Sequence, residues 1–233
     1  MAINKEVPQE QGGNQDLLTQ TIEEYRKGPL TPELVTNYWR AMLRVDGARA
    51  GLNIEVPDCD WTEEQIKRPM VDIEGNPVPG MMIYFPEQLR GKEGKIHLEE
   101  MYPEMANSSM YDRSLSITDT HKTTGWIKVE AAIETPNRNT RQKALEAFAK
   151  KQGYLGQREN AFILASKASK DLTGSYFGQR GRGTFCKLLG SPYASRVMYA
   201  LLNSDGNSYI FWLISPPDQS PFLGARFEEV KRT

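Results

Sequence analysis

The sequence predicts an α+β fold: a helical N-terminal region, then a mixed α/β region that ends in an antiparallel hairpin and a final strand. Apolar residues recur at helical spacing in the first third, and apolar and polar residues alternate between positions 125 and 134. Two β-branched and aromatic runs flank a polar turn near the C-terminus. The 233 residues are 39% hydrophobic and 25% charged, so we expect a soluble globular protein with a sizeable core.

The pattern divides the chain into three parts. Residues 1–15 are polar and rich in Gly and Gln, and we expect a disordered lead-in there. Residues 16–105 are expected to form a helical region with one hairpin. Residues 106–233 are expected to form an α+β C-terminal domain. The boundary is placed near residues 105–113, where helical patterns give way to strand patterns.

Three helices are expected before residue 70. The first spans residues 16–28, and the second spans 31–47, with Thr31 as cap and Pro32 in the first turn. The third begins at Thr62, has Gln65 in capping-box position and ends near a proline at 69. The apolar positions at helical spacing in the first two helices are Leu18, Ile22, Tyr25, Leu34, Tyr38, Met42 and Val45.

Strands are expected in the middle of the chain. Residues 70–73 and 81–85 predict a hairpin with a long loop. Residues 91–105 are expected to be irregular or one short helix, and 115–118 could form a strand. In residues 125–134, Ile127, Val129, Ala131 and Ile133 alternate with Lys128, Glu130 and Ala132, which predicts a strand with one buried and one solvated face.

The last third mixes short elements. A helix is expected to begin at Asn139 or Thr140 and to end at Gly153, and 161–165 is a strand candidate. Short helices are expected near 168–172 and 185–189, with Gly174 and Gly190 as their stops. The clearest signal is a hairpin of 196–202 and 209–214, followed by a final strand over 224–230.

Charge and hydropathy exclude several classes of protein. With 29 basic and 30 acidic residues the net charge is −1, which argues against a dedicated nucleic-acid binder. No apolar run is long enough for a membrane-spanning helix, and the N-terminus lacks the apolar segment of a signal peptide. We therefore expect no nucleic-acid partner and no membrane span, and a cytoplasmic location by default. Cys59 and Cys186 are expected to be buried free thiols.

Few residues indicate catalysis. The only histidines are His97 and His121, and no spacing forces them together with Cys59 or Asp119, so no metal, cofactor or catalytic residue is expected. The basic, Gly-rich segment 178–183 lacks the Lys-Ser/Thr of a phosphate-binding loop. An enzyme or mobile-element accessory protein that uses Arg180 and Arg182 with His121 or Asp119 remains the alternative to a binding protein.

Aromatic and small polar residues cluster at the C-terminal hairpin. Tyrosine provides rigid contact area, and Asn and Ser provide adaptable hydrogen bonds, so this composition is typical of recognition surfaces. A hairpin buried on both sides is the alternative interpretation. The expected ligand-contacting positions, called the recognition set below, are Tyr193, Arg196, Tyr199, Asn203, Asn207, Tyr209, Phe211, Asp218, Gln219 and Phe222.

The order of these features resembles a known family. Leu189-Gly190-Ser191, the hairpin and Leu223-Gly224-Ala225-Arg226-Phe227 resemble the end of C-type-lectin-like variable proteins diversified by retroelements. The resemblance covers residues 185–231, although Leu189-Gly190-Ser191-Pro192 stands where the family usually has Gly-Gly-x-Trp. It implies a C-type-lectin-like C-terminal domain that binds an unknown protein or small molecule, without catalysis or cofactor.

One count fits this resemblance. Diversification in the family targets adenines in codons that end in a pyrimidine, and such codons cannot encode Lys, Glu, Gln, Met or Trp. These five types make up 58 of the 233 residues, so about 8 are expected in residues 191–223, where 3 occur. A buried hairpin also avoids Lys and Glu, so the count favours the resemblance without requiring it.

Overall fold

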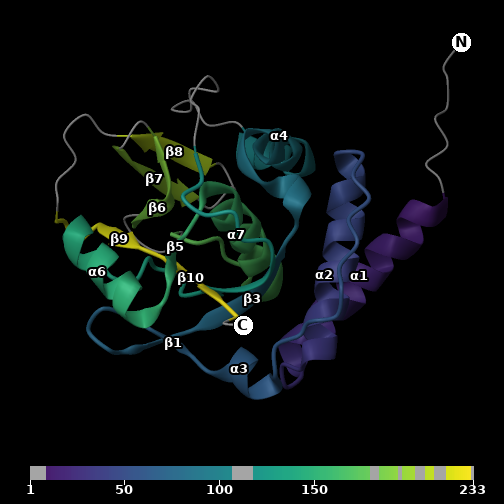
Figure 1. Cartoon of the computed structure of the whole chain (residues 1–233). Coiled ribbons are helices and arrows are strands. Elements are labelled where there is room, and N and C mark those ends of the chain that lie inside the picture. Colours follow the sequence, from purple (N-terminus) through teal and green to yellow (C-terminus); the bar gives the residue numbers. More distant parts are fainter. Residues whose placement is uncertain are drawn as a thin grey trace, which may run out of the picture.

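The structure is a computed structural model that describes residues 9–106, 118–178, 184–193, 196–202, 208–212 and 219–231. Side chains are not described at 9–12, 105–106, 193, 196, 201–202 and 208–212. Figure 1 shows an α+β architecture in which two N-terminal helices stand beside a body built from two four-stranded sheets and several helices. The predicted α+β class is therefore confirmed.

The N-terminal helices follow the predicted caps closely. α1 spans Gln9–Lys27, α2 spans Pro32–Arg49 and α3 spans Glu63–Lys67. The Thr31 side chain accepts from the N–H of Leu34, and both hydrogen bonds of the capping box are present at α3. Two ends differ from expectation. Residues 9–15, expected to be disordered, belong to α1, and α2 continues through Gly47 because helix contacts there outweigh the low helix propensity of glycine.

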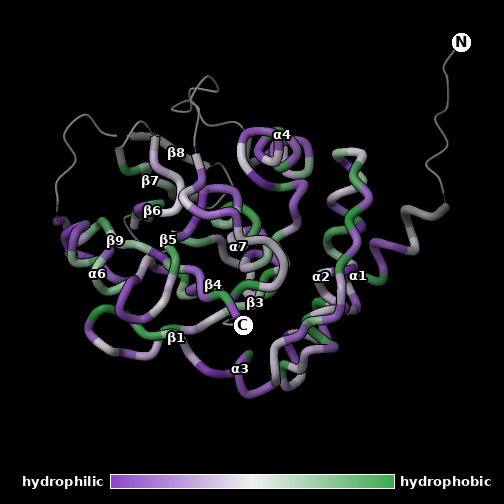
Figure 2. Tube along the Cα trace, viewed as in Figure 1, coloured by the Kyte–Doolittle hydropathy of each residue, from purple (hydrophilic) through white to green (hydrophobic). Residues whose placement is uncertain are grey.

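The apolar face of α2 lies in the core. Tyr38 and Met42 are fully buried, as is Trp39, whose indole N–H donates to the carbonyl of Met82 at 2.9 Å. Figure 2 shows hydrophobic segments around β3, whereas α4 is largely hydrophilic. The core that contains α2 extends without a break to Cys186 and Ala200, so the N-terminal and C-terminal parts of the chain share it.

The first large sheet has the order β3-β4-β10-β5, with antiparallel neighbours throughout. Its strands are β3 (Gly80–Phe85), β4 (Gly125–Glu130), β5 (Leu155–Gly156) and β10 (Phe227–Val230). The predicted hairpin of 70–73 with 81–85 is wrong. β1 (Met70–Val71) pairs with β2 (Pro77–Val78), and β3 pairs with β4, whose paired residues lie 40 to 50 positions further along the chain.

The alternation of apolar and polar residues correctly predicted β4 as a strand. The prediction that one face of this strand is solvated is wrong. Lys128 and Glu130 are fully buried, like Ile127 and Val129 on the other face. The Lys128 ammonium donates to the backbone carbonyls of Gln65 and Arg68 at the end of α3. Burial lowers the pKa of Lys128 to about 8. The second face is covered by segments distant in sequence, and charged side chains there are paired with polar groups.

Helices form much of the middle of the chain. Residues 91–105, expected to be irregular or one short helix, form α4 (Gly91–Met101) and part of α5 (Pro103–Ala106), after the short 3-10 helix η1 (Glu87–Leu89). α6 spans Gln142–Gln152. It ends at Gly153, as expected, but its N-cap is Arg141 rather than Asn139 or Thr140. α7 spans Glu159–Thr173, so the predicted strand at 161–165 is wrong. This short apolar run is buried on all sides, a pattern that does not separate helix from strand.

The second large sheet has the order β8-β7-β6-β9. β7 (Arg196–Leu202) and β8 (Ser208–Trp212) form the predicted antiparallel hairpin. The expected helix at 185–189 is wrong, because β6 (Phe185–Tyr193) is a strand that pairs antiparallel with β7 and parallel with β9 (Leu223–Ala225). The predicted final strand is split at Arg226, so that β9 and β10 lie in different sheets. The strand candidate at 115–118 lies largely outside the described residues.

The thiols and helices agree with two further expectations. Cys59 and Cys186 are buried and free. Within the described ranges, none of the helices combines the length and hydropathy that crossing a membrane requires.

Candidate functional site

The first strand of the predicted hairpin, β7, pairs with β6, and the described side chains in the middle of these two strands are buried on both faces. One face carries Cys186, Leu188, Met198 and Ala200, and each of these side chains is fully buried. Lys187, opposite Tyr199 in the register, lies on the other face and is 2% exposed. The described middle of β6 and β7 is therefore packed like a core.

The described members of the recognition set do not share one environment. Tyr199 is only 2% exposed, so the expectation of an exposed side chain does not hold at this position, because the second sheet face is covered. Phe222 is 43% exposed and Gln219 is exposed. These two residues lie directly before β9, at the end of the segment that follows the hairpin.

The other members are placed only in part. Tyr193, Arg196, Tyr209 and Phe211 lie in β6, β7 and β8, and their side chains are outside the description. Asn203, Asn207 and Asp218 lie outside the described residues, as do Arg180 and Arg182 of the basic segment.

A backbone clamp fixes the chain around Phe222. The Phe222 carbonyl accepts from the N–H of Phe185 at 2.8 Å, which ties it to the start of β6. The N–H of Asn139, a residue with positive φ, donates to the carbonyls of Ser220 and Leu223. The Gln219 amide in turn donates to the carbonyl of Asn139 at 3.1 Å. An exposed aromatic ring thus projects from a main chain that is held on both sides.

His121 and Asp119 of the alternative hypothesis have structural partners. The Asp119 carboxylate accepts from the Ser191 hydroxyl at 2.7 Å, and this hydroxyl accepts from the N–H of Glu159. The His121 Nε2 atom lies 3.2 Å from the carbonyl of Gly156, and its side chain is 12% exposed. Burial lowers the pKa of His121, while the nearby Glu228 carboxylate acts in the opposite direction.

Two buried arginines hold the crossover from β9 to β10, and sequence reasoning assigned a role to neither. The Arg158 guanidinium forms an ion pair with Glu228 at 2.8 Å, and neither side chain is exposed. Arg226 donates to the carbonyls of Glu130 and Ile133, and its guanidinium stacks 4.1 Å from the centre of the Phe177 ring. These groups are paired inside the protein, so they stabilise the frame rather than present themselves to a ligand.

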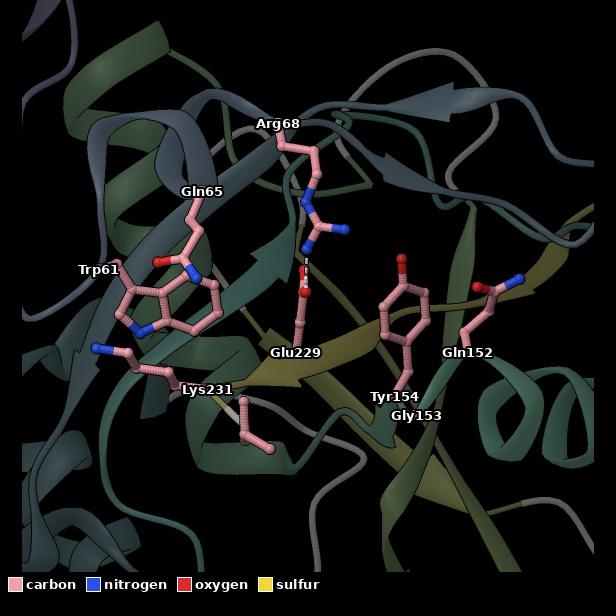
Figure 3. Close-up of a pocket in the computed structure, with 9 residues that line it drawn as sticks. Trp61, Gln65, Arg68, Gln152, Gly153, Tyr154, Glu229 and Lys231 are labelled. Carbon is pink, nitrogen blue, oxygen red and sulfur yellow. Dashed lines mark hydrogen bonds and ion pairs between the residues drawn. The ribbon is translucent and has the colours of Figure 1, made fainter. Parts of the chain in front are cut away.

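A groove of about 320 Å³ opens in the first sheet beside the end of β10, next to α3. Gly153 ends α6 in the left-handed conformation. The chain that follows pairs with β10 only through Leu155 and Gly156. β5 therefore leaves the end of β10 without a neighbour on that side. Figure 3 shows the polar and aromatic side chains that surround the opening: Trp61, Gln65, Arg68, Gln152, Tyr154, Glu229 and Lys231.

An ion pair between Arg68 and Glu229 stands in the middle of the groove (Figure 3). Trp61, Gln65 and Lys231 lie on one side of this pair, and Tyr154 lies on the other. No sequence signal could have found this groove, because its walls come from segments near residues 61–68, 152–154 and 229–231.

Within the described parts of the chain, no group of three or more His, Cys, Asp or Glu side chains could hold a metal ion. No family model matches the chain, and neither the curated proteins nor the solved structures contain a match.

Proposed function

We propose that the C-terminal part of the chain is a ligand- or protein-binding module without catalytic activity, which recognises its partner through residues at and after the β7–β8 hairpin. The observation that carries this proposal is Phe222. Phe222 is 43% exposed, yet its backbone carbonyl accepts a hydrogen bond from β6 and its neighbour Leu223 is only 5% exposed. An aromatic side chain held out from a rigid frame loses little conformational entropy when it binds, which is how anchors of binding surfaces work.

One further observation supports the proposal. The segment from 191 to 223 is poor in Lys, Glu, Gln, Met and Trp, which fits diversification as in C-type-lectin-like variable proteins. The burial of Tyr199 shifts the proposed contact surface away from the middle of β7 and toward Gln219 and Phe222.

A paired alanine substitution tests the surface. Phe222→Ala should change the free energy of unfolding by no more than about 0.5 kcal/mol, as at surface sites. Leu223→Ala, one residue later and buried, should cost about 2–5 kcal/mol. Urea denaturation of both variants measures this difference. A comparable large loss at Phe222 would show that its ring is needed for folding and would remove the proposed anchor.

The DNA around the coding sequence tests the proposed origin. A near-duplicate of the segment that encodes residues 191–223, next to a reverse transcriptase gene, is the expected finding. If no such copy exists, a retroelement does not diversify this segment, and the proposal reduces to a binding module with a fixed surface.

A further inference from the structure

We propose that the groove between α3 and the end of β10 is a second binding site, which takes a small ligand through a carboxylate group. The groove is separate from the hairpin: Figure 1 shows α3 at the bottom of the body and β8 at its top. A volume of about 320 Å³ is at the lower end of the range for ligand sites, which suits a small acid or the end of a peptide.

The free hydrogen-bonding capacity of the groove consists mainly of donors. Gln65 uses its amide oxygen to accept from Thr62, so its NH₂ group remains. Among the contacts described, Arg68 uses only Nη2, on Glu229, and its other N–H groups remain. Tyr154 accepts from the N–H of Val71 at 3.4 Å, which leaves its hydroxyl proton to donate. Such a set matches a ligand group that only accepts, as a carboxylate does.

The charges in and below the groove also favour an anion. Arg68 and Lys231 line it against a single carboxylate, Glu229, and Asp60 holds the Lys231 ammonium at 3.0 Å from outside. The Lys128 ammonium lies below, bonded to the carbonyls of Gln65 and Arg68. The three cations outnumber the two carboxylates, and a partly enclosed site weakens this attraction less than open water does.

Trp61 supplies an independent indication of a missing acceptor. Its side chain is 97% buried, and its indole N–H has no partner in the described structure. An unpaired buried donor is costly, and native proteins rarely keep one without a reason. Lys231 lines the same end of the groove and is 38% exposed (Figure 3). Exposed side chains change rotamer within nanoseconds, so Lys231 can move to admit an acceptor to this N–H.

The indole N–H provides the test. We would titrate the ¹⁵N-labelled full chain with acetyl-triglycine and follow the tryptophan indole signals by NMR, with Trp61→Phe to assign the signal of Trp61. This signal should move downfield, because its N–H gains an acceptor. The indole N–H groups of Trp39 and Trp126 already donate to Met82 and Asp58, so their signals should stay in place as internal controls. The titration should extend to about 10 mM, where a ligand with a Kd of 1 mM approaches saturation.

Two comparisons define the ligand chemistry. Acetyl-triglycine amide, which lacks the carboxylate, should bind at least tenfold more weakly. Succinate distinguishes the source of the carboxylate: equal binding indicates a small free acid, and weaker binding indicates the end of a peptide.

Arg68→Gln should abolish the shift of the Trp61 signal. Arg90→Gln, which breaks the ion pair with Glu87 beside η1 and outside the groove, should not.

Three results would overturn the proposal: an unmoved Trp61 signal with both acids, equal binding of acid and amide, or unchanged binding by a folded Arg68→Gln variant. Thermal melts of both arginine variants confirm that they are folded. These results do not depend on Phe222, so this site and the proposed hairpin surface can fail separately.

Discussion

Replacing Glu130 with glutamine should change how the stability of the protein depends on pH. The carboxyl group is fully buried and accepts from the Asn137 amide at 3.2 Å and from the N–H of Phe227 at 3.0 Å. Burial raises the pKa of Glu130 from its ordinary value of 4.5 to about 8, although the nearby Arg226 guanidinium acts in the opposite direction. The folded protein therefore keeps a proton that the unfolded chain releases.

The direction of the effect follows from proton binding. Below pH 4.5 the carboxyl is protonated in both states and its contribution to stability is complete. As the pH rises toward 8, only the unfolded chain loses the proton, so the free energy of unfolding falls. One pKa unit corresponds to about 1.36 kcal/mol, and a window of about 3.5 units therefore gives a loss of the order of 5 kcal/mol.

Urea denaturation at several pH values between 4 and 9 measures this loss. Glu130→Gln cannot ionise, so its stability relative to the parent should rise with pH by up to about 5 kcal/mol. Glu134→Gln, an exposed matched control in an ion pair with Arg138, shows what the loss of a surface charge alone does. If parent and Glu130→Gln follow parallel curves across the window, the carboxyl does not retain its proton on folding and the reasoning is refuted.

Two further predictions concern the core. Met42→Asp should lower the free energy of unfolding by more than about 3 kcal/mol, because it places a charge in the fully buried core beside Tyr102. A variant that melts like the parent would show that α2 does not pack in this core. Gly190→Ala should also destabilise the protein strongly, since the new Cβ would lie 2.1 Å from the carbonyl oxygen of Gly156. Gly13→Ala, with open space around it in α1, should instead stabilise by about 0.5–1 kcal/mol, and calorimetric melts of the two alanine variants should move in opposite directions.

The sequence by itself determined those helices and strands whose ends depend on hydrogen bonds or turns formed by residues close to each other in the chain. The caps at Thr31 and Thr62 and the stop at Gly153 lie where the sequence predicts them, because each satisfies backbone groups of its own helix. The β7–β8 hairpin was also predictable, since strand-forming runs flank a short polar turn. The α+β class followed from these elements.

Only the tertiary structure decided which strands pair, which faces are buried and where the sites lie. The alternation around Lys128 and Glu130 indicates a strand, but the segments that cover its second face come from elsewhere in the chain. For the same reason the sequence could not separate an exposed Phe222 from a buried Tyr199 within one aromatic cluster. The groove at Arg68 and Glu229 joins positions 161 residues apart, and periodicity reports only on neighbours along one helix or strand.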